Sequence, residues 1–243
     1  MATTTATKPL TAFRYVTFDV VGTLIDFEGA IKEGLAQIAA REGLAIDGEA
    51  ALSVYREARY EEGAQRFPDD LGRCYARIAA AMGLPDTEEY RQLMIDIVGE
   101  AKPFPDSVKA MAMLKQHYKL VAMTNARRWA FEKYAEKLGQ PFWAGFTTDD
   151  TGCEKPDPDY FHQVFAYVEQ DGGSKEDILH TAQSQYHDIG ISRALGMTNA
   201  WIQRRHAQSG YGGTIAPKEF TEPDYHFHAL AGLAQAADAA FRG

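Results

Sequence analysis

The sequence is poor in cysteine, in long apolar segments and in positive charge, and each shortage excludes a class of protein. Only two cysteines occur among 243 residues, Cys74 and Cys153, without the spacing of a metal site, so no disulfide framework is expected. No apolar run approaches the roughly 20 residues needed to cross a bilayer. The net charge of -9 argues against binding to nucleic acid or to a membrane surface.

The rest of the composition is that of an ordinary globular protein, with 45% hydrophobic and 24% charged residues. Residues 1–11 are rich in threonine and alanine and lack the apolar block of a signal peptide. We therefore expect a cytoplasmic location.

Apolar periodicity predicts an early strand followed by a block of helices. Residues 15–18 are β-branched and aromatic, as in a buried strand. Four helical patterns follow with no strand between them, and the last ends near Val98. The segment Lys102-Pro103-Phe104-Pro105 then reads as a hinge or linker.

Beyond this hinge, strands and helices alternate. Strands are expected at 120–123, 145–148, 178–182, 198–202 and 225–227, with single helices between most of them. Such spacing implies right-handed crossovers and a mainly parallel sheet. The sequence thus predicts an α/β fold with a doubly wound, Rossmann-like core formed by residues 1–27 and 104–243. Residues 28–103 would be an inserted helical cap that covers the end of the first strand.

Polar residues stand at the carboxyl ends of the expected strands. Each has an ordinary explanation, because Asp19 suits a turn while Thr124-Asn125 and Asp188 suit helix caps. In a parallel sheet, however, these ends meet at one edge, where ligands bind. Their joint placement therefore predicts one site built from Asp19, Thr124, Asn125, Lys155 and Asp188.

The same segments resemble the four motifs of the haloacid dehalogenase superfamily. They are Phe18-Asp19-Val20-Val21-Gly22-Thr23-Leu24, Thr124-Asn125, Lys155-Pro156-Asp157-Pro158 and Asp188. The helical insertion corresponds to the superfamily's C1-type cap. Within the superfamily the chain is most similar to the L-2-haloacid dehalogenases, whose first motif has the form Asp-x-Tyr-Gly-Thr. They also have counterparts of Pro105-Asp106-Ser107 and of Trp201-Ile202 with Arg204.

The residue two places after Asp19 indicates which bond is broken. In the superfamily's phosphatases an aspartate at this position protonates the leaving alkoxide and later activates water. Val21 cannot do so, whereas a halide leaves without a proton, so Val21 favours carbon–halogen cleavage. Because Asp188 is the only acid in the fourth motif, we expect no metal cofactor. The alternative is Mg²⁺ held by Asp19, the Val21 carbonyl and Asp188.

The resemblance implies a hydrolase that converts small 2-haloacids into 2-hydroxy acids. Asp19 would attack the carbon that bears the halogen, and water would then hydrolyse the aspartyl ester. Lys155 would orient Asp19, and Thr124 would stabilise the tetrahedral charge. Asp188 would hold Lys155 or help to activate water.

Four further residues are expected to contact the substrate, namely Val21, Arg56, Asn125 and Gln185. Arg56 would be the cap arginine that binds halide or carboxylate, with Arg59 as the alternative. Either arginine suits a solvated helix face equally well. Val21 and Gln185 replace a tyrosine and an asparagine of the dehalogenases, which leaves the substrate open.

Three other functions stay open. A phosphonatase would need a cap lysine, for which only Lys32 and Lys102 are available. A phosphatase would need Mg²⁺, and a degenerate binding protein would show no turnover at all. We expect the partner to be a haloacid carboxylate rather than nucleic acid or a membrane, and the resemblance allows a homodimer through the cap.

Overall fold

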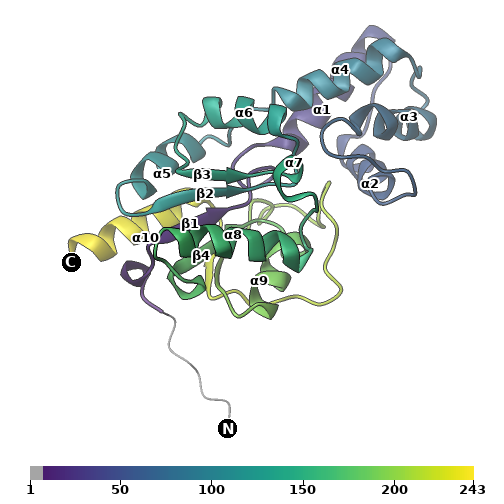
Figure 1. Cartoon of the computed structure of the whole chain (residues 1–243). Coiled ribbons are helices and arrows are strands. Elements are labelled where there is room, and N and C mark those ends of the chain that lie inside the picture. Colours follow the sequence, from purple (N-terminus) through teal and green to yellow (C-terminus); the bar gives the residue numbers. More distant parts are fainter. Residues whose placement is uncertain (1–7) are drawn as a thin grey trace.

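The computed structural model describes residues 8–243 and shows a six-stranded sheet beside a separate group of helices (Figure 1). The prediction that residues 1–11 are not a signal peptide falls mostly on residues 1–7, which lie outside the described residues. The strands are β1 (Tyr15–Phe18), β2 (Lys119–Met123), β3 (Ala144–Phe146), β4 (Ile178–Ala182), β5 (Thr198–Ile202) and β6 (Tyr225–Phe227). Their order is β3-β2-β1-β4-β5-β6 and every pair is parallel, which confirms the predicted fold class.

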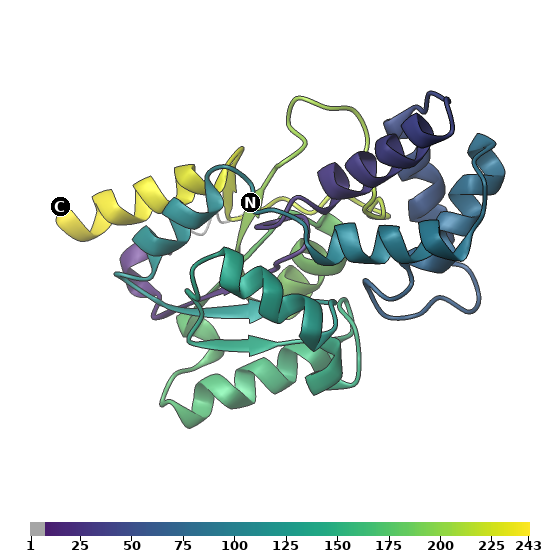
Figure 2. The same ribbon diagram turned by 90° about the horizontal axis from the view of Figure 1, so that it is seen from above.

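Helices cover both faces of the sheet, which explains why its central strands β1 and β4 are buried throughout (Figures 1 and 2). On one face lie α5 (Ser107–Leu114), α6 (Arg128–Lys137) and α10 (Leu230–Arg242). On the other lie α8 (Pro158–Gln170) and α9 (Gly190–Ala194). The sequence did not predict α10, which buries Leu230, Leu233, Ala234 and Ala237 at helical spacing.

Strand β3 is shorter than predicted. Thr147 is not in the strand but precedes the short helix α7 (Thr148–Thr151), where it forms a capping box with Asp150. The β-branched pair Thr147-Thr148 favours a strand by propensity, but the backbone hydrogen bond from Thr147 to Asp150 Oδ2, at 2.8 Å, ends it.

The inserted cap consists of α1 (Phe27–Arg41), α2 (Gly48–Ala58), α3 (Leu71–Met82) and α4 (Glu88–Gly99). These helices lie together beyond the carboxyl edge of the sheet (Figure 2). Their starts follow ordinary capping chemistry, since Asp26, Asp47 and Thr87 each accept a backbone N–H of the first turn. Helix α1 begins one residue before the predicted boundary at 28.

The two stretches of chain that connect core and cap run side by side. The Asp26 N–H donates to the Lys102 carbonyl at 2.9 Å, and the Phe104 N–H donates to the Leu24 carbonyl at 3.0 Å. The predicted hinge segment therefore forms one half of a paired connection.

None of the helices in residues 8–243 has the length and apolar character that crossing a lipid bilayer requires.

Candidate active site

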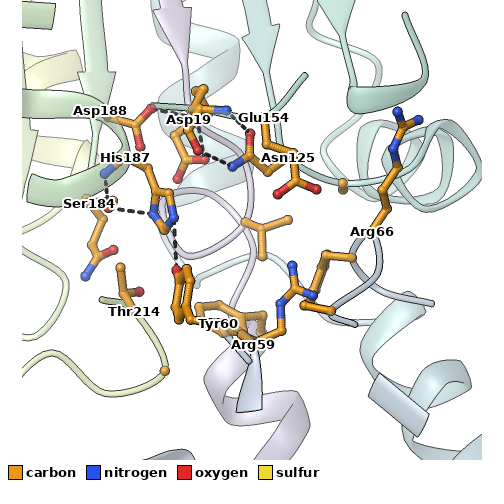
Figure 3. A pocket seen from close by; sticks show the side chains of 18 of the residues that line it. Asp19, Arg59, Tyr60, Arg66, Asn125, Glu154, Ser184, His187, Asp188 and Thr214 are labelled. Carbon is orange, nitrogen blue, oxygen red and sulfur yellow. Dashed lines mark hydrogen bonds and ion pairs between the residues drawn. The ribbon is translucent and has the colours of Figure 1, made fainter. Parts of the chain in front are cut away.

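Asp19 lies directly after β1, at the centre of the sheet's carboxyl edge. Because β1 pairs with both β2 and β4, the chain order reverses here, and open α/β sheets bind ligands at such a point. The Asp19 N–H donates to the Thr181 carbonyl at 3.1 Å, which fixes the backbone beside β4. Figure 3 shows the Asp19 carboxylate among side chains from several loops.

Lys155 joins the two aspartates into one buried group, as the sequence predicted. Its Nζ lies 3.0 Å from Asp19 Oδ1 and 2.6 Å from Asp188 Oδ1. The Lys155 side chain is only 1% exposed, so solvent hardly screens these contacts. Asn125 fixes the backbone of Lys155 through two hydrogen bonds of 2.8 Å, one in each direction. Asn125 therefore positions Lys155 as well as lining the cavity described below.

Both carboxylate oxygens of Asp19 are held. Oδ1 faces Lys155, and Oδ2 accepts a 2.6 Å hydrogen bond from the Thr23 hydroxyl. Thr23 is oriented in turn because its Oγ1 accepts the Gln183 N–H at 2.8 Å. Burial raises the pKa of Asp19 above its ordinary value, while the Lys155 ammonium opposes that rise. Thr23 is a site residue that the sequence had assigned only to a turn.

Asp188 sits in a single π-helical turn, η3 (Gln185–Ile189), just before α9. Its Oδ1 also contacts His180 Nε2 at 3.1 Å, and His180 Nδ1 lies 2.8 Å from the Thr17 hydroxyl. Burial alone would raise the pKa of Asp188, but Lys155 and His180 outweigh it and lower the pKa to about 2. An ionised carboxylate only accepts, so His180 donates from Nε2. The sequence had not predicted this role for His180, which lies inside β4.

A cavity of about 360 Å³ separates this group from the cap. From the core it is lined by Asp19, Val21, Asn125, Ala126, Glu154, Lys155, Gln183, Ser184, His187, Asp188, Gly213 and Thr214, and from the cap by Phe27, Tyr55, Arg59, Tyr60, Ala64, Gln65, Arg66 and Phe67. The cap thus covers the predicted nucleophile, and Val21 lies in the same cavity as Asp19.

Of the two arginines predicted for substrate binding, Arg59 lines the cavity and Arg56 does not. Arg59 Nη1 donates to Asp70 at 2.7 Å and to the Gln65 carbonyl at 2.6 Å. Arg56 is not among the lining residues and instead donates to the Gly212 carbonyl at 2.6 Å. Arg56 lies within α2, whereas Arg59 is the C-cap residue that follows its last residue, Ala58.

The long loop between β5 and β6 closes one side of the cavity. Its Gly213 and Thr214 line the cavity, and the Gly213 N–H donates to Glu28 Oε1 of the cap at 2.8 Å. Arg205 of the same loop forms ion pairs with Glu28 and Glu49. Core and cap therefore contact each other at a place separate from the hinge.

Besides Arg56, two further predicted residues do not line this cavity. Thr124 is fully buried at the end of β2, where its Oγ1 accepts the Ala126 N–H at 3.2 Å. Gln185 lines a different cavity, and its Oε1 accepts the Thr221 N–H at 3.1 Å. Their predicted roles in charge stabilisation and substrate contact stay predictions.

A chain of polar groups that the sequence had not predicted runs along one wall. Tyr60 OH lies 3.0 Å from His187 Nε2, and Ser184 Oγ lies 3.1 Å from His187 Nδ1 (Figure 3). Burial lowers the pKa of His187 to about 4, so its imidazole is neutral at neutral pH. The structure places His187 in the cavity wall.

The donor set suits Mg²⁺ poorly. Among residues 8–243, no group of three or more His, Cys, Asp or Glu side chains is placed to hold a metal ion. The two nearby carboxylates, Asp19 and Asp188, share the Lys155 ammonium, and Gln183 supplies no further acid. Mg²⁺ is usually bound by one or two carboxylates together with waters, and here the Lys155 ammonium already pairs with both carboxylates.

A parallel α/β core with a helical cap over a buried Asp–Lys–Asp group defines a class of capped hydrolases. The chain belongs to the haloacid dehalogenase-like hydrolase family, whose model matches residues 13–180. A comparison with curated protein sequences gave no match.

Solved structures show the same fold along most of the chain. An L-2-haloacid dehalogenase is 23% identical with a TM-score of 0.74, and the match covers 93% of this chain and 99% of that one. The L-2-haloacid dehalogenase from Xanthobacter autotrophicus is 22% identical, with a TM-score of 0.71 and coverage of 92% and 97%. The HAD-hydrolase YfnB from Bacillus subtilis, bound to magnesium, is 21% identical, with a TM-score of 0.72 and coverage of 93% and 99%. The fold is therefore shared by dehalogenases and by a magnesium-bound hydrolase.

Proposed function

We propose that the protein is a hydrolytic dehalogenase of small 2-haloacids that uses Asp19 as its nucleophile and needs no metal. The observation that carries this proposal is the pairing of Asp19 with Val21 in one cavity. Asp19 is held by Lys155 and Thr23, while Val21 occupies the place of a proton donor and cannot provide one. A leaving group that needs no proton fits this arrangement.

The first step is displacement at carbon. A carboxylate oxygen of Asp19 forms a bond to C2 of the haloacid, and the carbon–halogen bond breaks with its electron pair going to the halide. The Lys155 ammonium opposes the rise in pKa that burial causes at Asp19 and so favours the ionised carboxylate. Of the Arg59 nitrogens, Nη1 holds both hydrogen bonds, so Nε and Nη2 are available for halide or carboxylate.

The second step is hydrolysis of the aspartyl ester. Water attacks the carboxyl carbon of Asp19, and the bond between that carbon and the ester oxygen breaks. One proton of the water passes to the ester oxygen, so that the 2-hydroxy acid leaves, and the other goes to solvent as the Asp19 carboxylate is restored. We propose Asp188 as the group that positions this water, because its buried Oδ2 accepts no hydrogen bond from any described residue. Thr124 and the backbone N–H groups around it would stabilise the tetrahedral charge.

Halide release tests the proposal directly. Wild-type protein is assayed with chloro-, bromo- and fluoroacetate and with both enantiomers of 2-chloropropionate, with and without EDTA. Halide release that EDTA leaves unchanged is expected, and Asp19→Asn should abolish it. A single turnover in ¹⁸O-labelled water should place solvent oxygen in the Asp19 peptide before it appears in the product.

The second candidate function is a Mg²⁺-dependent phosphatase, which the similarity to a magnesium-bound hydrolase of the same fold favours. Phosphate release from small phosphate esters that requires Mg²⁺, without halide release, would replace the dehalogenase proposal. Val21 and the donor set described above count against it, because phosphate esters need a protonated leaving group.

A further inference from the structure

Glu154 is a charged residue of the cavity wall without an ionic partner. Its carboxylate forms no hydrogen bond and no ion pair with any other residue in the described part of the chain, 8–243. Figure 3 shows it across the cavity from His187, on the side of Arg59. It lies partly buried directly before Lys155, at a position outside the motif that identified the lysine.

The other charged groups of the wall are already paired. Lys155 forms ion pairs with both Asp19 and Asp188. Arg59 pairs with Asp70 at 2.7 Å, and Arg66 pairs with Asp149 at 3.0 Å. The two arginines act on Glu154 only at longer range, and burial raises its pKa. Glu154 thus offers the cavity a hydrogen-bond acceptor to which no side chain of residues 8–243 donates, and a bound ligand can supply the donor.

The size of the cavity also supports a ligand that extends beyond Asp19. A volume of about 360 Å³ falls in the range of roughly 300–1,000 Å³ usual for small-molecule sites. It equals roughly a dozen water-sized groups at about 30 Å³ each. Haloacetates and halopropionates fill less than this, so the cavity has room for a longer substrate that reaches past Asp19.

We propose that Glu154 determines substrate specificity by binding an ammonium or another N–H donor at the far end of the substrate. The inference rests on the proposed dehalogenase function and narrows its substrates to 2-haloacids that carry such a donor. A substrate with only a carboxylate leaves Glu154 unpaired and meets its negative charge. Glu154 therefore selects both for the donor and against the simple anion.

The test compares matched substrates in matched variants. The substrates are 6-amino-2-chlorohexanoate and 2-chlorohexanoate. The corresponding five-carbon pair, 5-amino-2-chloropentanoate and 2-chloropentanoate, shortens the distance between the carboxylate and the ammonium. The variants are Glu154→Gln, which keeps the shape and removes the charge, and the control Glu169→Gln, at an exposed position on α8. The quantity compared is the ratio of kcat/KM for the amino substrate to kcat/KM for its unsubstituted partner.

A hydrogen bond to a charged group contributes about 1.5–3 kcal/mol, so Glu154→Gln should lower that ratio by about ten- to a hundredfold. Glu169→Gln should leave it unchanged. Equal ratios in wild type and Glu154→Gln would overturn the inference while halide release itself still supports the dehalogenase. No halide release from any substrate would contradict the proposed function instead.

Direct binding separates the two proposals further. Calorimetry with 6-aminohexanoate and hexanoate needs no turnover. Tighter binding of the amino acid to wild type, lost in Glu154→Gln, supports the role of Glu154 whatever bond is cleaved. Equal affinity for the two ligands refutes it.

Discussion

Replacing Lys155 by methionine should destabilise the protein and inactivate it at neutral pH. The change removes the ammonium that lies 3.0 Å from Asp19 and 2.6 Å from Asp188 and leaves two carboxylates facing each other. Removing one partner of a buried pair costs about 3–5 kcal/mol. For a chain of this size, that corresponds to a fall in Tm of about 6–20 °C.

Urea unfolding at neutral pH measures this cost, with Lys133→Met as the matched control. Lys133 pairs with Glu100 at 2.5 Å but is 46% exposed, so its loss should cost at most about 1 kcal/mol. Adding Asp188→Asn to Lys155→Met removes one of the unpaired charges and should recover part of the stability. The reasoning fails if Lys155→Met is no less stable than Lys133→Met, or if the second substitution lowers stability further.

The same variant should show a changed pH profile. Burial raises the pKa of Asp19 and Lys155 opposes that rise, so Asp19 in Lys155→Met keeps its proton to higher pH. Residual halide release should therefore increase as the pH rises from neutral. A profile parallel to that of wild type would show that Lys155 does not control the ionisation of the nucleophile.

Three further outcomes are expected. Arg59→Met should lower kcat/KM for haloacids about tenfold or more, whereas Arg56→Met, which loses a contact to the loop after β5, should mainly lower Tm. The folded pKa of Asp188 is about 2 against an ordinary 3.8, so its stabilising contribution is present above pH 4 and lost as the pH falls toward 2. Urea titrations should show that loss in wild type and not in Asp188→Asn. Arg204→Met removes a guanidinium that is 8% exposed and bonded to Asp106 at 2.7 Å, and thermal unfolding should show a loss of about 3–5 kcal/mol.

The fold was predictable wherever local pattern and final environment agree. Buried strands such as β1 and β4 are short apolar segments, and both were predicted with their observed limits. Helix α10 was missed although alanine favours helices and its buried residues recur at helical spacing, and its apolar side packs against α5. Thr147 has a high β-strand propensity and was therefore predicted to lie in a strand. Asp150, three residues later, instead makes Thr147 the N-cap of a helix.

The site was predictable where a residue follows a strand and harder to predict elsewhere. The positions of Asp19, Lys155 and Asp188 follow from the shared edge of a parallel sheet. The choice between Arg56 and Arg59 depends on how α2 is rotated, which residue types alone do not fix. The position of Glu154 in the cavity wall depends on the conformation of its loop. No short motif indicates that its carboxylate lacks an ion pair with the described residues.

The paired connection between core and cap also limits how the cavity can open. Two crossings far apart would allow the cap to slide or twist in several directions. Here the two segments that connect core and cap are hydrogen-bonded to each other, Asp26 to Lys102 and Phe104 to Leu24. We therefore expect the cap to move relative to the core by a hinge rotation about one axis, which passes through this pair of segments.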